Sequence, residues 1–225
     1  MELYYCGSAK PERVADALRA ALSQLPTDGV RTPLPRPAAK EAPAQPREVV
    51  ESLDVTQGKL TMGLRTGSTV WSEDYPALLL ANAIFGGTTT SRLFLHVREK
   101  LSLCYYASSQ LEKLKGVMLV SSGVEFDKVG EARAEILSQL EACRKGAFED
   151  WELEGARRSV VSALHSAMDA QARLEDFWLG QAVADLTEDP EALARRVEEV
   201  TREQVVAAFS SLQLDTIYFL KGREA

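Results

Sequence analysis

The stretch that decides the fold is residues 85–108, FGGTTTSRLFLHVREKLSLCYYAS. A glycine pair and a threonine run end the apolar segment before it, and Ser91 can accept a hydrogen bond from the first free backbone N–H groups of a new helix. Apolar residues then recur at helical spacing, at Leu93, Phe94, Val97 and Leu101. After Lys100 the pattern changes to tyrosines and small residues, which predicts a strand.

Arg98 and Tyr105 are the candidate functional residues of this stretch, seven positions apart across the predicted helix-to-strand turn. A guanidinium is always charged and a phenol carries one O–H, so both can donate hydrogen bonds to a single carbonyl oxygen. The structural alternative is that Arg98 solvates a helix end while Tyr105 lies within a sheet. Spacing alone favours that alternative.

The chain on either side predicts strand pairs that alternate with helices. Residues 49–55 and 60–65 form two adjacent strands around a turn at Gln57-Gly58, which predicts a hairpin. A nearly all-apolar helix is expected next, then a second hairpin, then an amphipathic helix, over residues 73–85, 105–111 with 117–124, and 127–144.

The C-terminal third is predicted to be helical up to a last strand. Residues 148–186 form a long helical region that contains Gly155 and Gly180 and is expected to be broken or kinked. Later signals are a helix start at Asp189-Pro190, a capping box from Thr201 to Gln204 before a helix over 205–212, and a strand over 217–220. This order predicts an α+β fold, with a mixed or antiparallel sheet and helices packed on one face.

The N-terminal residues predict the tail of a preceding domain. A short strand over 3–6 and a helix over 11–25 are too little for a domain, and residues 26–46 are a proline-rich linker. We therefore expect residues 1–25 to end one domain and residues 47–225 to form the next. The apolar strands near Gly7 and Gly222 would be equivalent last strands.

Composition narrows the classes of partner. The chain has 225 residues, 45% apolar, with a net charge of −7 and no cluster of basic and aromatic residues, which argues against nucleic acid. Cys6, Cys104 and Cys143 form no Cys-x-x-Cys pair, which favours a reducing, cytoplasmic setting. No secretory signal and no apolar run of roughly 18 residues is present, so no membrane partner is expected.

Six motifs, in order, carry a family resemblance: Asp74-Tyr75, Phe85-Gly86-Gly87, Ser91-Arg92-Leu93-Phe94, Arg98-Glu99-Lys100, Trp151-Glu152-Leu153-Glu154 and Val200-Thr201-Arg202-Glu203-Gln204-Val205. Together they resemble the C-terminal homologous domain of the pitrilysin and mitochondrial-processing-peptidase family, the inverted zinc peptidases. The resemblance implies one half of a clam-shell that closes around a peptide substrate. In it, Arg98 and Tyr105 are implied to reach the scissile carbonyl.

The zinc site of that family does not occur in this sequence. Inverted zinc peptidases use His-x-x-Glu-His, whereas this chain has only His96 and His165. In His96-Val97-Arg98-Glu99-Lys100 a lysine stands where the second histidine would be, and an ammonium cannot ligate zinc. Both histidines are interpreted as structural, and no cofactor is expected in this chain.

Other catalytic signatures are lacking as well. Gly86-Gly87-Thr88 has neither the ending of a P-loop nor the spacing of a dinucleotide fingerprint, and no Gly-x-Ser-x-Gly occurs. The acidic residues at 149–154 are interpreted as a response to a helix dipole.

The resemblance therefore implies that zinc, its ligands and the general base belong to another domain or to a separate catalytic subunit, as in a heterodimer. This chain would be inactive alone and would contribute contacts to the substrate. The alternative is a non-catalytic pseudo-peptidase that serves as an assembly or peptide-binding module. A His-x-x-Glu-His domain or chain encoded alongside would distinguish the two.

Overall fold

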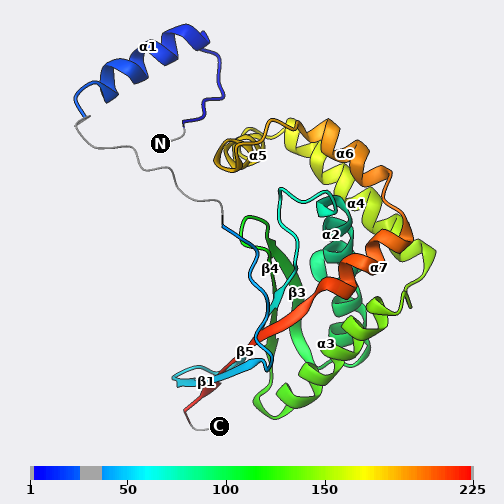
Figure 1. Ribbon diagram of the computed structural model, residues 1–225. Helices are drawn as coiled ribbons and strands as arrows, with labels where there is room; N and C mark the ends of the chain where they lie inside the picture. The colour runs from blue at the N-terminus through cyan, green and yellow to red at the C-terminus, as the bar shows by residue number, and fades with distance from the viewer. Residues whose placement is uncertain (1–2, 26–36, 224–225) are drawn as a thin grey trace.

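A computed structural model describes residues 3–25 and 37–223. A five-stranded sheet has its helices on one face and leaves the other face open (Figure 1). The α+β fold with helices on one side is therefore confirmed. Most of the predicted linker, residues 26–36, lies outside the described residues, and residues 37–46 contain no helix or strand.

The sheet is mixed, in the order β1-β5-β2-β4-β3. Its strands are β1 (Arg47–Leu53), β2 (Gly58–Arg65), β3 (Cys104–Glu112), β4 (Val117–Val124) and β5 (Gln213–Gly222). All pairs are antiparallel except β1 with β5. Strand β2 alternates strictly, with Leu60, Met62 and Leu64 buried under the helices and the residues between them on the open face.

The predicted hairpin between the first two strands is wrong. Strand β1 pairs with β5, which lies between β1 and β2. Crossing one intervening strand requires about 10 Å, which the four residues between the strands can span, since an extended residue reaches about 3.3 Å. Nearness in sequence suggested pairing, but β2 takes its two partners from distant parts of the chain. The second hairpin, β3 with β4, is confirmed.

The helices follow the predicted order. They are α1 (Pro11–Leu22), α2 (Tyr75–Asn82), α3 (Val129–Arg144), α4 (Asp150–Met168), α5 (Gln171–Ala184), α6 (Pro190–Glu198) and α7 (Arg202–Ser211), with a 3₁₀ turn, η3 (Phe126–Lys128), before α3. The capping box of Thr201 and Gln204 is present, and the Asp189 carboxylate accepts a hydrogen bond from the Ala192 N–H at 2.7 Å. The start signals in the sequence were therefore reliable.

The long C-terminal helical region is broken, as predicted, but at neither of its two glycines. Helix α4 ends at Met168 and α5 begins at Gln171, whereas Gly155 and Gly180 lie inside these helices. A single glycine in a helix costs only about 1 kcal/mol, which tertiary contacts can offset. The break follows Asp169 instead.

The N-terminal segment differs from the rest of the chain. Residues 3–6 form no strand, contrary to the prediction, and α1 has no buried residue. A strand needs a neighbouring strand to satisfy its backbone hydrogen bonds, and none of the described strands pairs with this segment. Within residues 3–25 and 37–223, no helix is long and apolar enough to cross a membrane.

Candidate functional site

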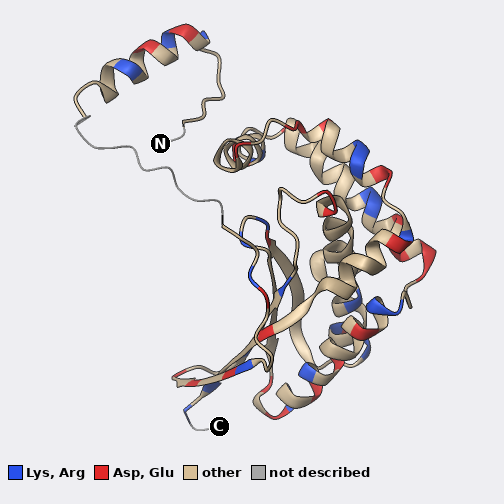
Figure 2. Ribbon diagram, viewed as in Figure 1, with Lys and Arg blue, Asp and Glu red and all other residues tan. Residues whose placement is uncertain are grey.

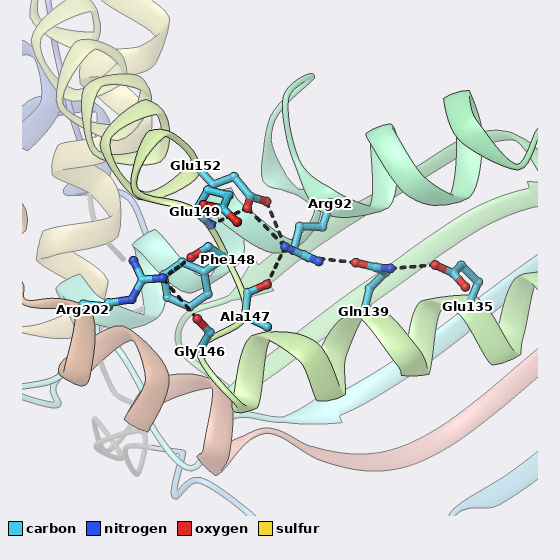
Figure 3. Close-up of polar contacts among 9 residues, drawn as sticks. All are labelled: Arg92, Glu135, Gln139, Gly146, Ala147, Phe148, Glu149, Glu152 and Arg202. Atoms are coloured by element: carbon cyan, nitrogen blue, oxygen red, sulfur yellow. Dashed lines mark hydrogen bonds and ion pairs between the residues drawn. The ribbon is translucent and has the colours of Figure 1, made fainter.

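The arginine of the Ser-Arg-Leu-Phe motif is buried at the centre of a polar network (Figure 3). Arg92 Nε donates to Gln139 Oε1 at 2.8 Å, and Nη1 donates to the Ala147 carbonyl at 2.9 Å and to both carboxylate oxygens of Glu152 at 3.2 Å. The Arg92 and Glu152 side chains are only 10% and 6% exposed. A buried pair with further hydrogen bonds fixes geometry, because each charge alone would be costly to bury.

Glu152 also caps the helix on which it lies. Its Oε2 accepts the Glu149 N–H at 2.7 Å, while the Glu149 side chain caps the first turn of α4 in return. The sequence interpretation of the 149–154 acids as a response to the helix dipole missed the ion pair of Glu152. A buried arginine sixty positions away gives no local signal.

A second arginine lies close to this network, at the junction where the starts of η2, α4 and α7 meet. Arg202 lies over the Phe148 ring at 4.4 Å and donates to the Gly146 and Phe148 carbonyls (Figure 3). Arg202 also pairs with Asp150 at 2.8 Å. The junction thus joins residues from three of the sequence motifs. Their role in this structure is to fix the starts of η2, α4 and α7 relative to one another.

The residues on either side of Arg92 have unusual helical geometry. Two segments are π-helical, η1 (Ala83–Gly87) and η2 (Leu93–Lys100), and Ser102 beyond η2 has a positive φ of 50°. Strained backbone of this kind is commonly found at functional sites. Gly86 permits it, because a Cβ there would lie 2.5 Å from the Ser109 backbone nitrogen.

Arg98 lies near the end of η2 and is partly exposed. Its guanidinium lies over the Phe94 ring at 4.7 Å, its Nε is 3.6 Å from Glu99 Oε1, and its side chain is 42% exposed. Burial raises the pKa of the Cys104 thiol, while a hydrogen bond with Ser122 and the charge of Arg98 oppose the rise. The charge of Arg98 therefore acts on the pKa of Cys104, the residue before Tyr105.

A β-bulge interrupts the alternation of the edge strand β3 at Tyr105. Cys104 pairs with Val124 and Tyr106 with Gly123, so Tyr105 is the extra residue of β3. Strict alternation with buried Ala107 would place Tyr105 under the helices, yet Tyr105 is 61% and Tyr106 39% exposed. Bulges commonly change the direction of a side chain, and no local sequence pattern predicts this one.

A hollow of about 320 Å³ adjoins Tyr105. Phe126 and Val124 form apolar walls, and Thr56, Gln57, Glu125 and Asp127 complete the lining. Glu125 is paired with Lys128 at 3.2 Å. Tyr105 therefore lines a concave surface with both polar and apolar residues.

Both histidines lie on helical segments. His96 lies on η2, where burial and the charges of Arg92 and Lys100 lower its pKa, and His165 lies far along α4. Within residues 3–25 and 37–223, no group of three His, Cys, Asp or Glu side chains could hold a metal ion. The described residues do not fit the zinc site of an inverted zinc peptidase.

Comparison with known families agrees with this arrangement. The sequence profile described as "Peptidase M16 inactive domain" matches residues 1–160. The chain belongs to the peptidase M16 family. It is an inactive-domain chain of that family, in keeping with the pitrilysin and mitochondrial-processing-peptidase resemblance.

Comparisons with individual proteins are consistent with the assignment. A Bacillus subtilis protein named as a probable inactive metalloprotease is 39% identical over 180 residues, which cover 80% of this chain and 42% of that protein. An Enterococcus faecalis structure described as a conserved protein has a TM-score of 0.76 at 28% identity, over 83% of this chain and 44% of that one. This chain thus spans less than half of each of these two relatives.

A third likeness concerns the fold. The structure of a peptidase M16 inactive domain from Pseudomonas fluorescens has a TM-score of 0.71 at 21% identity, over 95% of this chain and 52% of that one. The five-stranded sheet with helices on one face is therefore the fold of an M16 inactive domain.

Proposed function

We propose that this chain is the C-terminal, zinc-free half of a peptidase assembly, in which Arg98 and Tyr105 donate hydrogen bonds to the carbonyl of a peptide substrate. Hydrolysis would take place at a zinc site of another domain or of a separate catalytic subunit, and this chain alone would be inactive. In this proposal residues 1–25 complete a preceding domain, residues 26–46 are the linker, and the assembly works in the cytoplasm.

The observation that carries the proposal is the bulge at Tyr105. It gives an otherwise inward-facing position of the edge strand β3 a 61% exposed phenol. A large aromatic residue exposed by a distortion of the backbone is poorly explained by stability. Arg98, also exposed, lies on η2, which contacts β3.

The charge distribution suits a peptide better than nucleic acid. Acidic and basic residues are interspersed over the helices instead of gathering by sign (Figure 2). On the open face, Lys59 Nζ lies 5.4 Å from the centre of the Tyr106 ring, and Tyr218 donates to Glu51 at 2.6 Å. A mixed polar and aromatic surface of this kind can accept an extended peptide.

The test is cleavage by the assembled protein that contains a His-x-x-Glu-His partner. Tyr105→Phe and Arg98→Met should each lower kcat about 100-fold with little change in KM, because a donor to a developing oxyanion acts mainly in the transition state. Matched controls are Tyr5→Phe and Lys100→Met, which change exposed residues to which no substrate contact is assigned. Cleavage unchanged by Tyr105→Phe and Arg98→Met, or lowered equally by the controls, would refute the assignment.

A second candidate function is a non-catalytic pseudo-peptidase that binds peptides or supports assembly. It is favoured by the 39% identical Bacillus subtilis relative, which is named as a probable inactive metalloprotease. The two functions differ in one feature outside this chain. A His-x-x-Glu-His sequence in the rest of the protein or in a neighbouring chain supports the peptidase, and its lack there supports the pseudo-peptidase.

A further inference from the structure

A second hollow, of about 330 Å³, lies on the helix side of the sheet. Residues from α2, α4, α5 and α6 line it, together with Lys113 from the turn between β3 and β4. In Figure 1, α5 lies across the end of the sheet from which this turn projects. The volume is at the lower end of the range for small-molecule sites.

The body of this hollow is apolar. Its apolar walls are aliphatic side chains and the Phe177 ring: Leu79, Ala83, Val160, Leu164, Phe177 and Leu193. Such a lining favours a ligand with a hydrocarbon body, since removing apolar surface from water is the main driving force there.

Lys113 brings the one ammonium group of this lining. Its Nζ lies 3.0 Å from where a Cβ of Gly180 would be, so the missing side chain of Gly180 leaves room for it. Burial lowers the pKa of Lys113, and Asp176 opposes that change from a position beyond ion-pair distance. Within the described residues, the Lys113 ammonium makes no hydrogen bond or ion pair, so a negative charge would be well placed beside it.

The other polar groups of the lining can also donate. Asn82 Oδ1 accepts from Ser109 Oγ at 2.8 Å, which leaves the Asn82 NH₂ group as a donor. Tyr75 and Ser159 add hydroxyl groups. Burial and the nearby charge of Glu188 raise the pKa of Tyr75 to about 12, so its phenol keeps its proton. A set made mainly of donors matches a ligand group that only accepts.

From these observations we propose that the hollow binds a small aliphatic monocarboxylate, with its carboxylate on Lys113 and its hydrocarbon body between α2, α4 and α5. The carboxylate is the acceptor-only anion that this donor set fits, and one ammonium matches one charge. None of these residues belongs to η2 or to the open face, so the inference does not depend on the roles proposed for Arg98 and Tyr105.

Octanoate and octanol are the probes that test it, titrated calorimetrically into the full chain. Octanoate should bind at least about tenfold more tightly than octanol, because only the carboxylate gains a charge-assisted hydrogen bond. Lys113→Gln should remove that difference. The matched control is Lys115→Gln, which changes an exposed lysine of the same turn and should leave octanoate binding unchanged.

Asp176→Asn provides a second, independent readout. The Asp176 carboxylate repels the negative charge of octanoate. Its removal should therefore tighten octanoate binding by about twofold or more and leave octanol binding unchanged. Urea unfolding of each variant verifies that the fold is retained. Equal affinity for octanoate and octanol, no binding of either, or loss of octanoate binding in Lys115→Gln would each overturn the proposal.

Discussion

At the scale of single residues, Arg92 and Arg98 have different environments, although both lie in the stretch 85–108. They are six positions apart, yet Arg92 is 10% exposed and bonded to Glu152, whereas Arg98 is 42% exposed. Arg92→Met would leave the Glu152 carboxylate buried without its partner. We expect this change to lower the free energy of unfolding by about 3 kcal/mol or more.

Urea unfolding measures this difference, with Arg98→Met as the control. Arg98 has only a partly exposed ring contact and a weak ion pair, so its replacement should cost less than about 1 kcal/mol. Glu152→Gln keeps an acceptor for Arg92 and should fall between the two. Similar losses for Arg92→Met and Arg98→Met would show that the buried network does not hold the fold together.

At the scale of the elements, two glycines predict opposite effects. A Cβ at Gly86 would lie 2.5 Å from the Ser109 nitrogen of β3, whereas a Cβ at Gly155 in α4 would meet nothing within 4 Å. Gly86→Ala should force η1 away from β3 and destabilise the fold by about 2 kcal/mol. Gly155→Ala should stabilise it by about 0.5–1 kcal/mol, since alanine favours helix.

Thermal unfolding of these two variants checks the sign directly. Gly86 is required because η1 and β3 approach closely there, whereas Gly155 is only tolerated within a helix. A stable Gly86→Ala variant with an unchanged far-UV spectrum would contradict the close approach of η1 and β3.

Element order could be predicted from the sequence because local signals decide it. The capping box at Thr201, the start at Asp189-Pro190 and the alternation of residues 60–65 all depend on neighbours a few positions away. The pairing of β1 could not be predicted from local signals, because its partner β5 lies more than 150 residues later in the chain and takes the place beside β2. Nearness along the chain is a poor guide when a distant strand is the better partner.

The candidate site divides in the same way. The positions of Arg98 and Tyr105 at a helix end and on a strand followed from local pattern, but the exposure of Tyr105 depends on a bulge against Val124. The ion pair of Glu152 and the position of Lys113 in a hollow could not be predicted for a similar reason. Their significance comes from Arg92 and Gly180, which are remote in sequence and become neighbours only in the folded chain.

At the scale of the whole molecule, one hydrophobic core joins both halves of the chain. In the described part of the chain, this core takes residues from β2, β4, β5 and the helices that cover them, but none from α1 or β1. Cys143 lies inside this core, and burial raises the pKa of its thiol to about 12. Cys6 lies outside it and is exposed. The cysteines therefore report separately on the core and on the N-terminal segment.

Because the cysteines differ in burial, their rates of thiol labelling at pH 8 measure how often the whole core opens. Cys6 should react at once and Cys104, half-buried at the start of β3, more slowly. Cys143 should react only when the core opens, because both access and a thiolate are needed. If opening is global, Arg92→Met should speed the labelling of Cys143 on the order of 100-fold, matching a loss of about 3 kcal/mol, and leave Cys6 unchanged. Rapid labelling of Cys143 in the unsubstituted chain would instead mean that α3 opens without the rest of the sheet and helices, and that the core is not one cooperative unit.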